Sequence, residues 1–160
     1  MKKCTLFKVI PFIFIVILIA SCGDRSENRQ VKQAAEIHKE IMQRHDSIYE
    51  WLNEKQKWVS KKLETESDRK MISAYESMDR SLDRGFKLLA SWESAVVGVP
   101  GIPHDHHPGH SHSHDEDVVD RMSDKELLEL HKAYKARLDE VEKKIDNLID
   151  TIDTYMADAQ

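Results

Sequence analysis

The feature that most constrains the fold is a seven-residue rhythm in the last third of the chain. Apolar or semi-apolar residues recur there alternately four and three positions apart over about four heptads: Leu127, His131, Tyr134, Leu138, Val141, Ile145, Leu148, Ile152 and Tyr155. This spacing follows one face of an α-helix, whereas a half-buried strand would alternate. Ser123 and Glu126 precede the rhythm with capping-box spacing. The sequence therefore predicts a long amphipathic helix that begins directly after Ser123.

Two earlier stretches have the same kind of periodicity. The first covers about 27–63, with a stripe at Val31, Ala34, His38, Ile41, His45, Ile48, Leu52 and Val59. The second has its stripe at Met71, Tyr75, Met78, Leu82, Leu89, Trp92 and Val96. The residues between them are polar but include no Gly or Pro, so a helical hairpin and one continuous helix both remain open. The change of phase favours a hairpin, with Thr65 and Asp68 at capping-box spacing and Ser67 as a second possible cap.

Helix-breaking residues dominate the region from about 93 to 123, which contains Gly98, Pro100, Gly101, Pro103, Pro108 and Gly109. The predicted fold is therefore all-α: three long amphipathic helices form an antiparallel bundle or coiled coil, with a long disordered His-rich loop at about 97–122 between the second and third. Gly85, beside Phe86 in the second stripe, would permit a close helix contact. A hairpin would bring the loop to the end at which the chain enters the bundle; a continuous helix would carry it to the far tip.

The first twenty-one residues have the organisation of a secretory signal. Lys2, Lys3 and Lys8 form a basic head, and the apolar run over 9–20 is too short to span a bilayer comfortably. Ile19-Ala20-Ser21-Cys22 ends this run and resembles the lipobox of bacterial lipoproteins, whose cysteine thiol carries diacylglycerol and becomes the first residue of the mature chain. An uncleaved signal anchor is the alternative.

The lipobox resemblance implies a signal peptide over 1–21, a lipid-anchored tether over 22–28 and a helical bundle domain over 29–160. It also implies a bacterial cell envelope protein that binds membrane lipid through acylated Cys22. Gly23, in place of Asp after this cysteine, gives no sign of inner-membrane retention, so the outer membrane is favoured.

The net charge and the cysteine content exclude several classes of function. Removal of the three signal lysines lowers the 24 basic residues to 21 against 29 acidic ones, a net charge of −8. Nucleic acid is therefore not expected as a partner, because phosphate binding needs a basic surface. Cys4 would leave with the signal and Cys22 would carry lipid, which excludes a disulfide framework and a thiolate nucleophile.

The strongest functional feature is a cluster that holds six of the nine histidines within eleven positions: His104, His106, His107, His110, His112 and His114. Imidazole is a common ligand of zinc, nickel and copper. A turn at Pro108-Gly109 would bring nitrogens from both halves together, and Asp105, Asp115 and Asp117 could add oxygen ligands, as could Glu116. We therefore predict a site for a divalent transition metal suited to buffering or hand-over. The alternative is a low-complexity insertion with no metal role.

Other residues give weaker signals. His38, Met42 and His45 share one helix face, but the two histidines are about 10 Å apart by helix rise, too far to share an ion directly. We expect these histidines and His131 at helix edges, hydrogen-bonded or half exposed. The Trp and Tyr residues at helical spacing are expected in the core. We find no Ser-His-Asp triad pattern, phosphate loop or metalloprotease motif. No catalytic residues are therefore predicted, and we do not expect an enzyme.

The lipobox followed by Ile37-His38-Lys39-Glu40-Ile41-Met42, Met78-Asp79, Trp92 and Met122-Ser123 resembles a group of small helical lipoproteins of Gram-negative bacteria, some labelled "viral A-type inclusion protein-like". The resemblance brings no activity or catalytic residues with it, and the His-rich insertion departs from its pattern. Two functions are therefore expected: a lipid-anchored metal-binding or metal-buffering protein, or a structural lipoprotein whose helices bind an envelope partner or self-associate.

Overall fold

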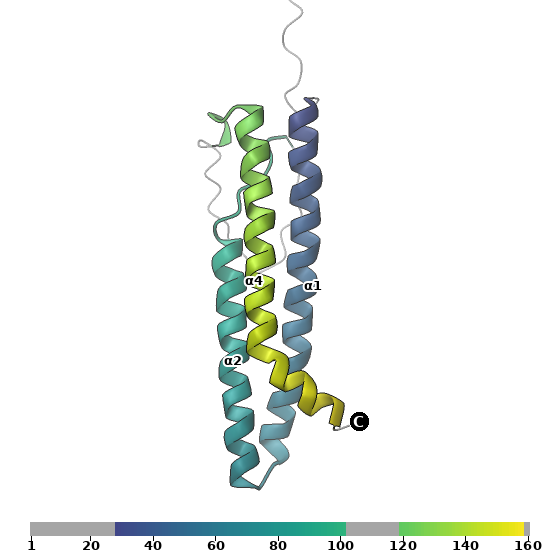
Figure 1. The fold of residues 1–160 in the computed structure, drawn as a ribbon, viewed down its shortest axis with the longest axis vertical. Helices are drawn as coiled ribbons and strands as arrows, with labels where there is room; N and C mark the ends of the chain where they lie inside the picture. The colour runs from purple at the N-terminus through teal and green to yellow at the C-terminus, as the bar shows by residue number, and fades with distance from the viewer. Residues whose placement is uncertain (1–27, 102–118, 159–160) are drawn as a thin grey trace, which may run out of the picture.

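The computed structural model describes residues 28–101 and 119–158. It contains three long helices, α1 (Arg29–Thr65), α2 (Arg69–Glu93) and α4 (Asp124–Asp158) (Figure 1). Each helix packs against the other two. The predicted all-α fold with three long helices is confirmed, and none of the described helices is long and apolar enough to cross a membrane.

Helix α1 begins at the Asn28 cap, whose side chain accepts a hydrogen bond from the backbone nitrogen of Gln30 at 2.9 Å. All eight residues of the predicted stripe are buried, and Lys55 completes the heptad rhythm between Leu52 and Val59. Its ammonium group lies 4.9 Å from the centre of the Trp51 ring and pairs with Asp153 of α4. The aliphatic stem of a lysine can therefore occupy a core-facing position while its charge reaches a carboxylate at the surface.

The chain reverses between α1 and α2, so the hairpin is confirmed and the continuous helix is excluded. The predicted capping by Thr65 or Ser67 is wrong, because Thr65 is the last residue of α1 and Asp68 caps α2. The side chain of Asp68 accepts from the backbone nitrogen of Lys70 at 2.7 Å. Glu66 Oε1 accepts from the backbone nitrogens of Ser67 and Asp68, at 2.8 and 2.9 Å. Carboxylates thus satisfy the free donors of this turn without Gly or Pro.

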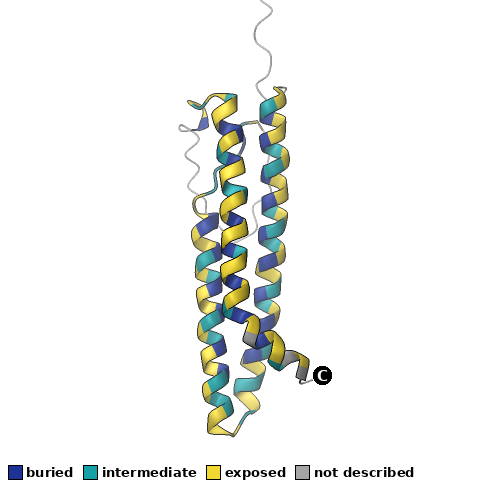
Figure 2. Cartoon of the chain, viewed as in Figure 1, coloured by how far each residue is buried: buried dark blue, intermediate teal, exposed yellow. Residues whose placement is uncertain are grey.

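Close packing between α2 and its neighbours depends on Gly85. A Cβ atom there would lie 3.2 Å from Leu52 Cδ2 of α1 and 3.8 Å from Ile145 Cγ2 of α4. The three helices therefore meet at this level, as the sequence predicted for a glycine within the second stripe. Figure 2 shows the buried residues of each helix as a stripe that faces the other helices.

Helix α4 begins with the predicted capping box. Ser123 donates its backbone N–H to Glu126 Oε2 at 2.8 Å, and Glu126 returns its backbone N–H to Ser123 Oγ at 3.3 Å. Of the predicted stripe, six residues are buried, and Tyr134, Leu148 and Tyr155 are half-buried against the core. The predicted heptad positions of this helix therefore form its buried face.

Helices α1 and α4 run in the same direction, and α2 runs opposite to both (Figure 1). Four ion pairs match α1 to α4 in ascending order. Lys135 pairs with Glu40 at 2.6 Å, Arg44 with Asp139 at 2.7 Å and with Glu142, and Lys55 with Asp153. The last turns of α4, which contain Asp153, bend across α1 (Figure 1). In Figure 1 the chain therefore runs down, up and down again, with each helix antiparallel to the one before it.

Two apolar clusters form the core. The main cluster consists of Ile41, Ile48, Leu52, Val59, Tyr75, Met78, Leu82, Leu89, Trp92, Leu138, Val141, Ile145, Ile149 and Ile152. The entry cluster consists of Val31, Ala34, Val99, Val119, Leu127 and Leu128. It lies at the end of the bundle where α1 and α4 begin, which we call the entry end.

Candidate functional site

The predicted metal ligands lie outside the described residues. This holds for His104, His106, His107, His110, His112 and His114 and for the accessory Asp105, Asp115 and Asp117. Cys22, the predicted lipidation site, also lies outside. The metal and lipid sites therefore stay predictions, and the structure bears on them only through the residues on either side.

The two segments that lead into and out of the His-rich stretch are anchored in the entry cluster. Val99 is 4% exposed and Val119 is 5% exposed, and both pack with Val31 and Ala34 of α1. Gly101 has a φ of 74°, a left-handed conformation that glycine adopts without strain. Because Asn28 caps α1 at this same end, the chain that precedes the bundle and both flanks of 102–118 meet there.

A buried polar layer separates the entry cluster from the main cluster. His131 of α4 is 0% exposed, and the centre of its ring lies 5.4 Å from that of His38 of α1, in an edge-to-face arrangement. Its Nδ1 lies 2.9 Å from the carbonyl oxygen of Leu127, so this nitrogen donates the hydrogen bond. Burial lowers the pKa of His131, while the backbone hydrogen bond to Leu127 acts in the opposite direction. Nε2 of His131 has no hydrogen-bond partner among the described residues.

A second buried polar group, packed against the main cluster, joins α1 to the end of α2. His45 and Glu93 are 4% and 6% exposed, and Nε2 of His45 lies 3.6 Å from Oε2 of Glu93. The Trp92 ring stacks on His45 with centroids 5.9 Å apart, and its Nε1 donates to the Tyr134 carbonyl oxygen at 3.1 Å. Burial raises the pKa of Tyr134, and a hydrogen bond with the Val97 backbone lowers it. The His45 side chain of α1 and the Tyr134 backbone of α4 therefore fix the end of α2 that leads toward the His-rich stretch.

The bundle histidines do not form a metal site. Among residues 28–101 and 119–158, no three or more His, Cys, Asp or Glu side chains are grouped so as to hold an ion. His38 faces His131 and His45 faces Glu93, so the two α1 histidines have different partners. Of the two alternatives expected for these histidines, half exposure is wrong, because His38, His45 and His131 are buried. Hydrogen bonding is confirmed for His45, with Asp46, and for His131, with the Leu127 carbonyl oxygen.

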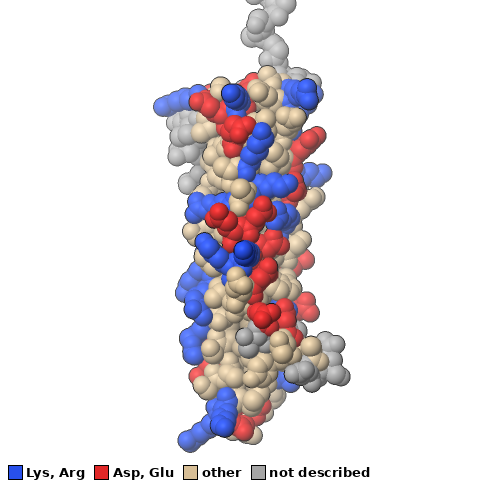
Figure 3. Space-filling view, viewed as in Figure 1, with Lys and Arg blue, Asp and Glu red and all other residues tan. Residues whose placement is uncertain are grey.

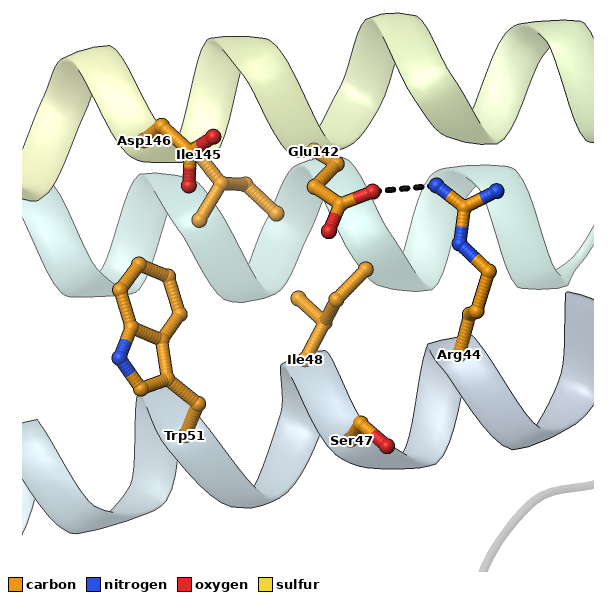
Figure 4. A pocket seen from close by; sticks show the side chains of 7 residues that line it. All are labelled: Arg44, Ser47, Ile48, Trp51, Glu142, Ile145 and Asp146. Carbon is orange, nitrogen blue, oxygen red and sulfur yellow. Dashed lines mark hydrogen bonds and ion pairs between the residues drawn. The ribbon is translucent and has the colours of Figure 1, made fainter.

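An acidic groove runs along the junction of α1 and α4 and encloses about 240 Å³. Figure 4 shows its lining residues, with Trp51 directed from α1 toward α4: Arg44, Ser47, Ile48, Trp51, Glu142, Ile145 and Asp146. Arg44 is occupied by Asp139 and Glu142, and these hydrogen bonds raise its pKa. Partial burial raises the pKa of Asp146, and the charges of Glu142 and Asp153 add to this effect. Asp146 makes no ion pair within the described ranges, so the groove has an excess of negative charge.

A basic groove lies on the other side of α4, at its junction with α2, and encloses about 550 Å³. Its lining residues are Arg84, Lys87, Leu88, Lys144, Asn147 and Leu148. Lys87 pairs with Asp83 at 2.6 Å, whereas Arg84 Nη2 donates to the uncharged Ser81 hydroxyl at 3.1 Å. The two grooves differ in charge at the same level of the bundle. In Figure 3, Lys and Arg gather along the α2 edge, while Asp and Glu gather where α4 meets α1.

No family model, curated protein or solved structure matches this chain. The resemblance to small helical lipoproteins therefore stays a prediction based on the residues that carry it. Neither groove was predicted from the sequence, and neither was the burial of Glu93 and Lys55. Lys55 had a signal, because it lies three positions after Leu52 and four before Val59. Glu93 had a weaker one, as the neighbour of Trp92 at the end of the second stripe.

Proposed function

We propose that this chain is a lipid-anchored protein of the cell envelope that binds a divalent transition metal through His104, His106, His107, His110, His112 and His114. One observation carries the proposal. Both flanks of the His-rich stretch pack at the entry end, the end from which the chain leads back to Cys22. The metal ligands would thus be held close to the membrane surface and to whatever transports or exchanges metal there.

Chain length supports this location. Asn28 follows Cys22 by six positions, and six steps of extended chain reach about 20 Å at most. Acyl chains on Cys22 would contribute about 0.8 kcal/mol for each buried methylene group. The entry end would therefore stay near the bilayer while the hairpin turn points away from it.

The ligand chemistry supports a role in buffering. Alternate histidines of an extended chain point the same way, so each half of the stretch can offer more than one imidazole to an ion. Packing of Val99 and Val119 holds the ends of the stretch at one end of the bundle, which lowers the entropy cost of closing it around a metal. Ordering the residues between these ends still opposes binding, which favours exchangeable metal over a tightly held catalytic ion.

Calorimetry on the full chain, purified from membranes in mild detergent, tests the metal proposal. We expect zinc, nickel or copper to release binding heat with the unaltered chain, and a variant with all six histidines of 104–114 replaced by serine to lose it. That variant retains His38, His45 and His131, so it controls for binding by the bundle. A second variant, Asp105→Asn with Asp115→Asn and Asp117→Asn, should weaken binding less. Unchanged heat in the six-serine variant would overturn the proposal.

Labelling with palmitate tests the anchor separately. We expect Cys22→Ala to lose the label and Cys4→Ala to retain it, since the fourth residue lies in the predicted signal. The two variants make a matched pair because each removes one of the chain's two cysteines. Label that persists in Cys22→Ala would refute lipid attachment at this residue without bearing on metal binding.

The alternative is a structural lipoprotein whose helices bind an envelope protein or a further copy of the chain. The observation that favours it is the pair of oppositely charged grooves beside α4. A complex that forms equally well with chelator present, and with the six-serine variant, would favour this alternative over metal buffering.

A further inference from the structure

The acidic and basic grooves lie at one level of the bundle because α4 contributes neighbouring residues to both. Glu142, Ile145 and Asp146 line the acidic groove, and Lys144, Asn147 and Leu148 line the basic one. Any two copies that stand side by side with parallel axes and equal heights would therefore bring an acidic groove level with a basic one.

The charges of the two grooves are complementary. In the acidic groove Arg44 is shared by Asp139 and Glu142, which leaves Asp146 without a counter-charge among the described residues. In the basic groove Asp83 neutralises Lys87, which leaves Arg84 and Lys144 without an acidic partner within the described ranges. Each groove thus has an excess of the charge that the other lacks.

Both grooves also include apolar side chains between their charged rims. Trp51 and Ile48 line the acidic groove, and Leu88 and Leu148 line the basic one. All but Ile48 are half-buried, so each face offers some apolar surface but no large patch. Such a face suits a weak contact in which charge sets the register and orientation.

We propose that copies of this chain associate side by side, with the α1/α4 face of one copy against the α2/α4 face of the next. Lys144 and Arg84 of one copy pair with Asp146 and Glu142 of its neighbour, and Trp51 covers Leu88 and Leu148. The occupant of each groove is therefore a second copy of the chain.

A second copy fits better than an unrelated partner because one chain carries both complementary faces at equal height. The proposed lipid anchor adds to this, since it would give all copies the same orientation and concentrate them in one plane; only this part rests on the proposed function. The two faces differ, so the contact is heterologous and continues as a ring or a row instead of ending at a dimer.

Cross-linking in native membranes tests the contact. Ser47 lines the acidic groove and Asn147 lines the basic one, and both are exposed. Ser47→Cys and Asn147→Cys are made separately in full chains that also carry Cys4→Ala, with different tags, and treated with a short bis-maleimide. We expect a cross-linked pair when the two variants are expressed together, and little or none when either is expressed alone.

Reversal of charges in the two grooves provides a second test of the contact. Asp146→Lys in the Ser47→Cys chain should abolish the mixed cross-link, and adding Lys144→Glu to the Asn147→Cys chain should restore it, because the two changes together reverse the charges on the two faces that meet. Glu76→Lys, an exposed position on α2 outside both grooves, makes the same charge change as Asp146→Lys and should leave the yield unchanged. Raised salt should lower the yield.

Three results would overturn the proposal: no mixed cross-link, equal cross-linking of either single variant with itself, or cross-links only to a different protein. Palmitate labelling of the same membranes shows independently whether the anchor is present. A labelled chain without the mixed cross-link therefore refutes the contact alone. A mixed cross-link in an unlabelled chain refutes the anchor alone.

Discussion

The main cluster and the entry cluster are both buried apolar clusters, but they consist of different side chains. The main cluster fills the space among three helices with Leu, Ile, Met and aromatic residues, whereas the entry cluster is built from Val, Ala and two Leu residues. Val99 and Val119, from the chain between α2 and α4, take the place of α2 residues at the entry end, because α2 already ends at Glu93. The larger buried side chains therefore lie in the main cluster, and the smaller entry cluster holds the flanks of the His-rich stretch.

The polar layer makes this contrast sharper. His38 and His131 lie between the two clusters, where a chain selected for stability alone would place leucines. Burial of His131 makes the stability of this layer depend on pH, while the main cluster consists of side chains that do not titrate near neutral pH. Four experiments test the difference between the two regions, from the largest expected effect to the smallest.

Leu52→Ala should give the largest loss of stability. Leu52 is 0% exposed and lies opposite Gly85 where the three helices meet, so truncation leaves a cavity and should lower the free energy of unfolding by about 2–5 kcal/mol. Val31→Ala at the entry end removes less buried surface and should lower it by about 1.5 kcal/mol. Urea titration of both variants measures the comparison. Equal losses would show that the main cluster and the entry cluster contribute equally to the free energy of unfolding.

Acid should destabilise the protein through His131. Burial holds its folded pKa below the ordinary value of 6.5, so the unfolded chain takes up the proton first as the pH falls. The contribution of this residue is complete above pH 6.5 and declines below it, by at most about 1.4 kcal/mol per pH unit.

His131→Leu should therefore lose less stability than the unaltered chain between pH 6.5 and 5.5, as measured by urea titration. Between pH 8 and 7 both proteins should have the same slope, which serves as the internal control. Parallel curves across the acidic range would contradict a buried neutral His131.

Trp92→Phe tests the connection between the main cluster and α4. It keeps an aromatic ring but removes the hydrogen bond from Nε1 to the Tyr134 carbonyl oxygen, which should lower the free energy of unfolding by about 1 kcal/mol. Trp58→Phe is the matched control, since Trp58 is only half-buried and packs edge-to-face on Tyr75. A loss no greater than that of Trp58→Phe would mean that this hydrogen bond contributes little.

Removal of a helix cap should give the smallest loss of stability, and each loss should be confined to one end of the bundle. Ser123→Ala removes a capping box at the entry end and Asp68→Ala removes the cap at the hairpin end, each at a cost of about 1 kcal/mol. Hydrogen exchange should quicken near the start of α4 in the first variant and near the start of α2 in the second. Faster exchange throughout the bundle in both variants would show that the ends do not open separately.

The helix faces could be predicted from the sequence because each depends on local spacing. The stripe from Val31 to Val59, the capping box at Ser123 and the hairpin all followed from periodicity, phase and cap chemistry. The cap at Asp68 was predicted wrongly because several polar residues in 64–70 could serve, and the geometry of the turn selects among them.

The layer and the grooves could not be predicted, because each requires residues far apart in the chain. His38 and His131 are separated by most of the bundle sequence, and their contact depends on the register between α1 and α4. The same register brings Arg44 to Asp139 and Glu142 and leaves Asp146 without a counter-charge. A pattern of charges on one helix face does not reveal which neighbour will neutralise it.

The sequence by itself determined where the helices lie, which face each one buries and that the chain reverses between α1 and α2, because hydrogen bonding within a helix and the burial of an apolar stripe act over a few residues. Only the tertiary structure decided that Val99 and Val119 seal the entry end, that three histidines are buried, and that α4 separates an acidic groove from a basic one. These depend on how three helices share one core, and packing across the bundle is set by side-chain volume and pairing between distant segments.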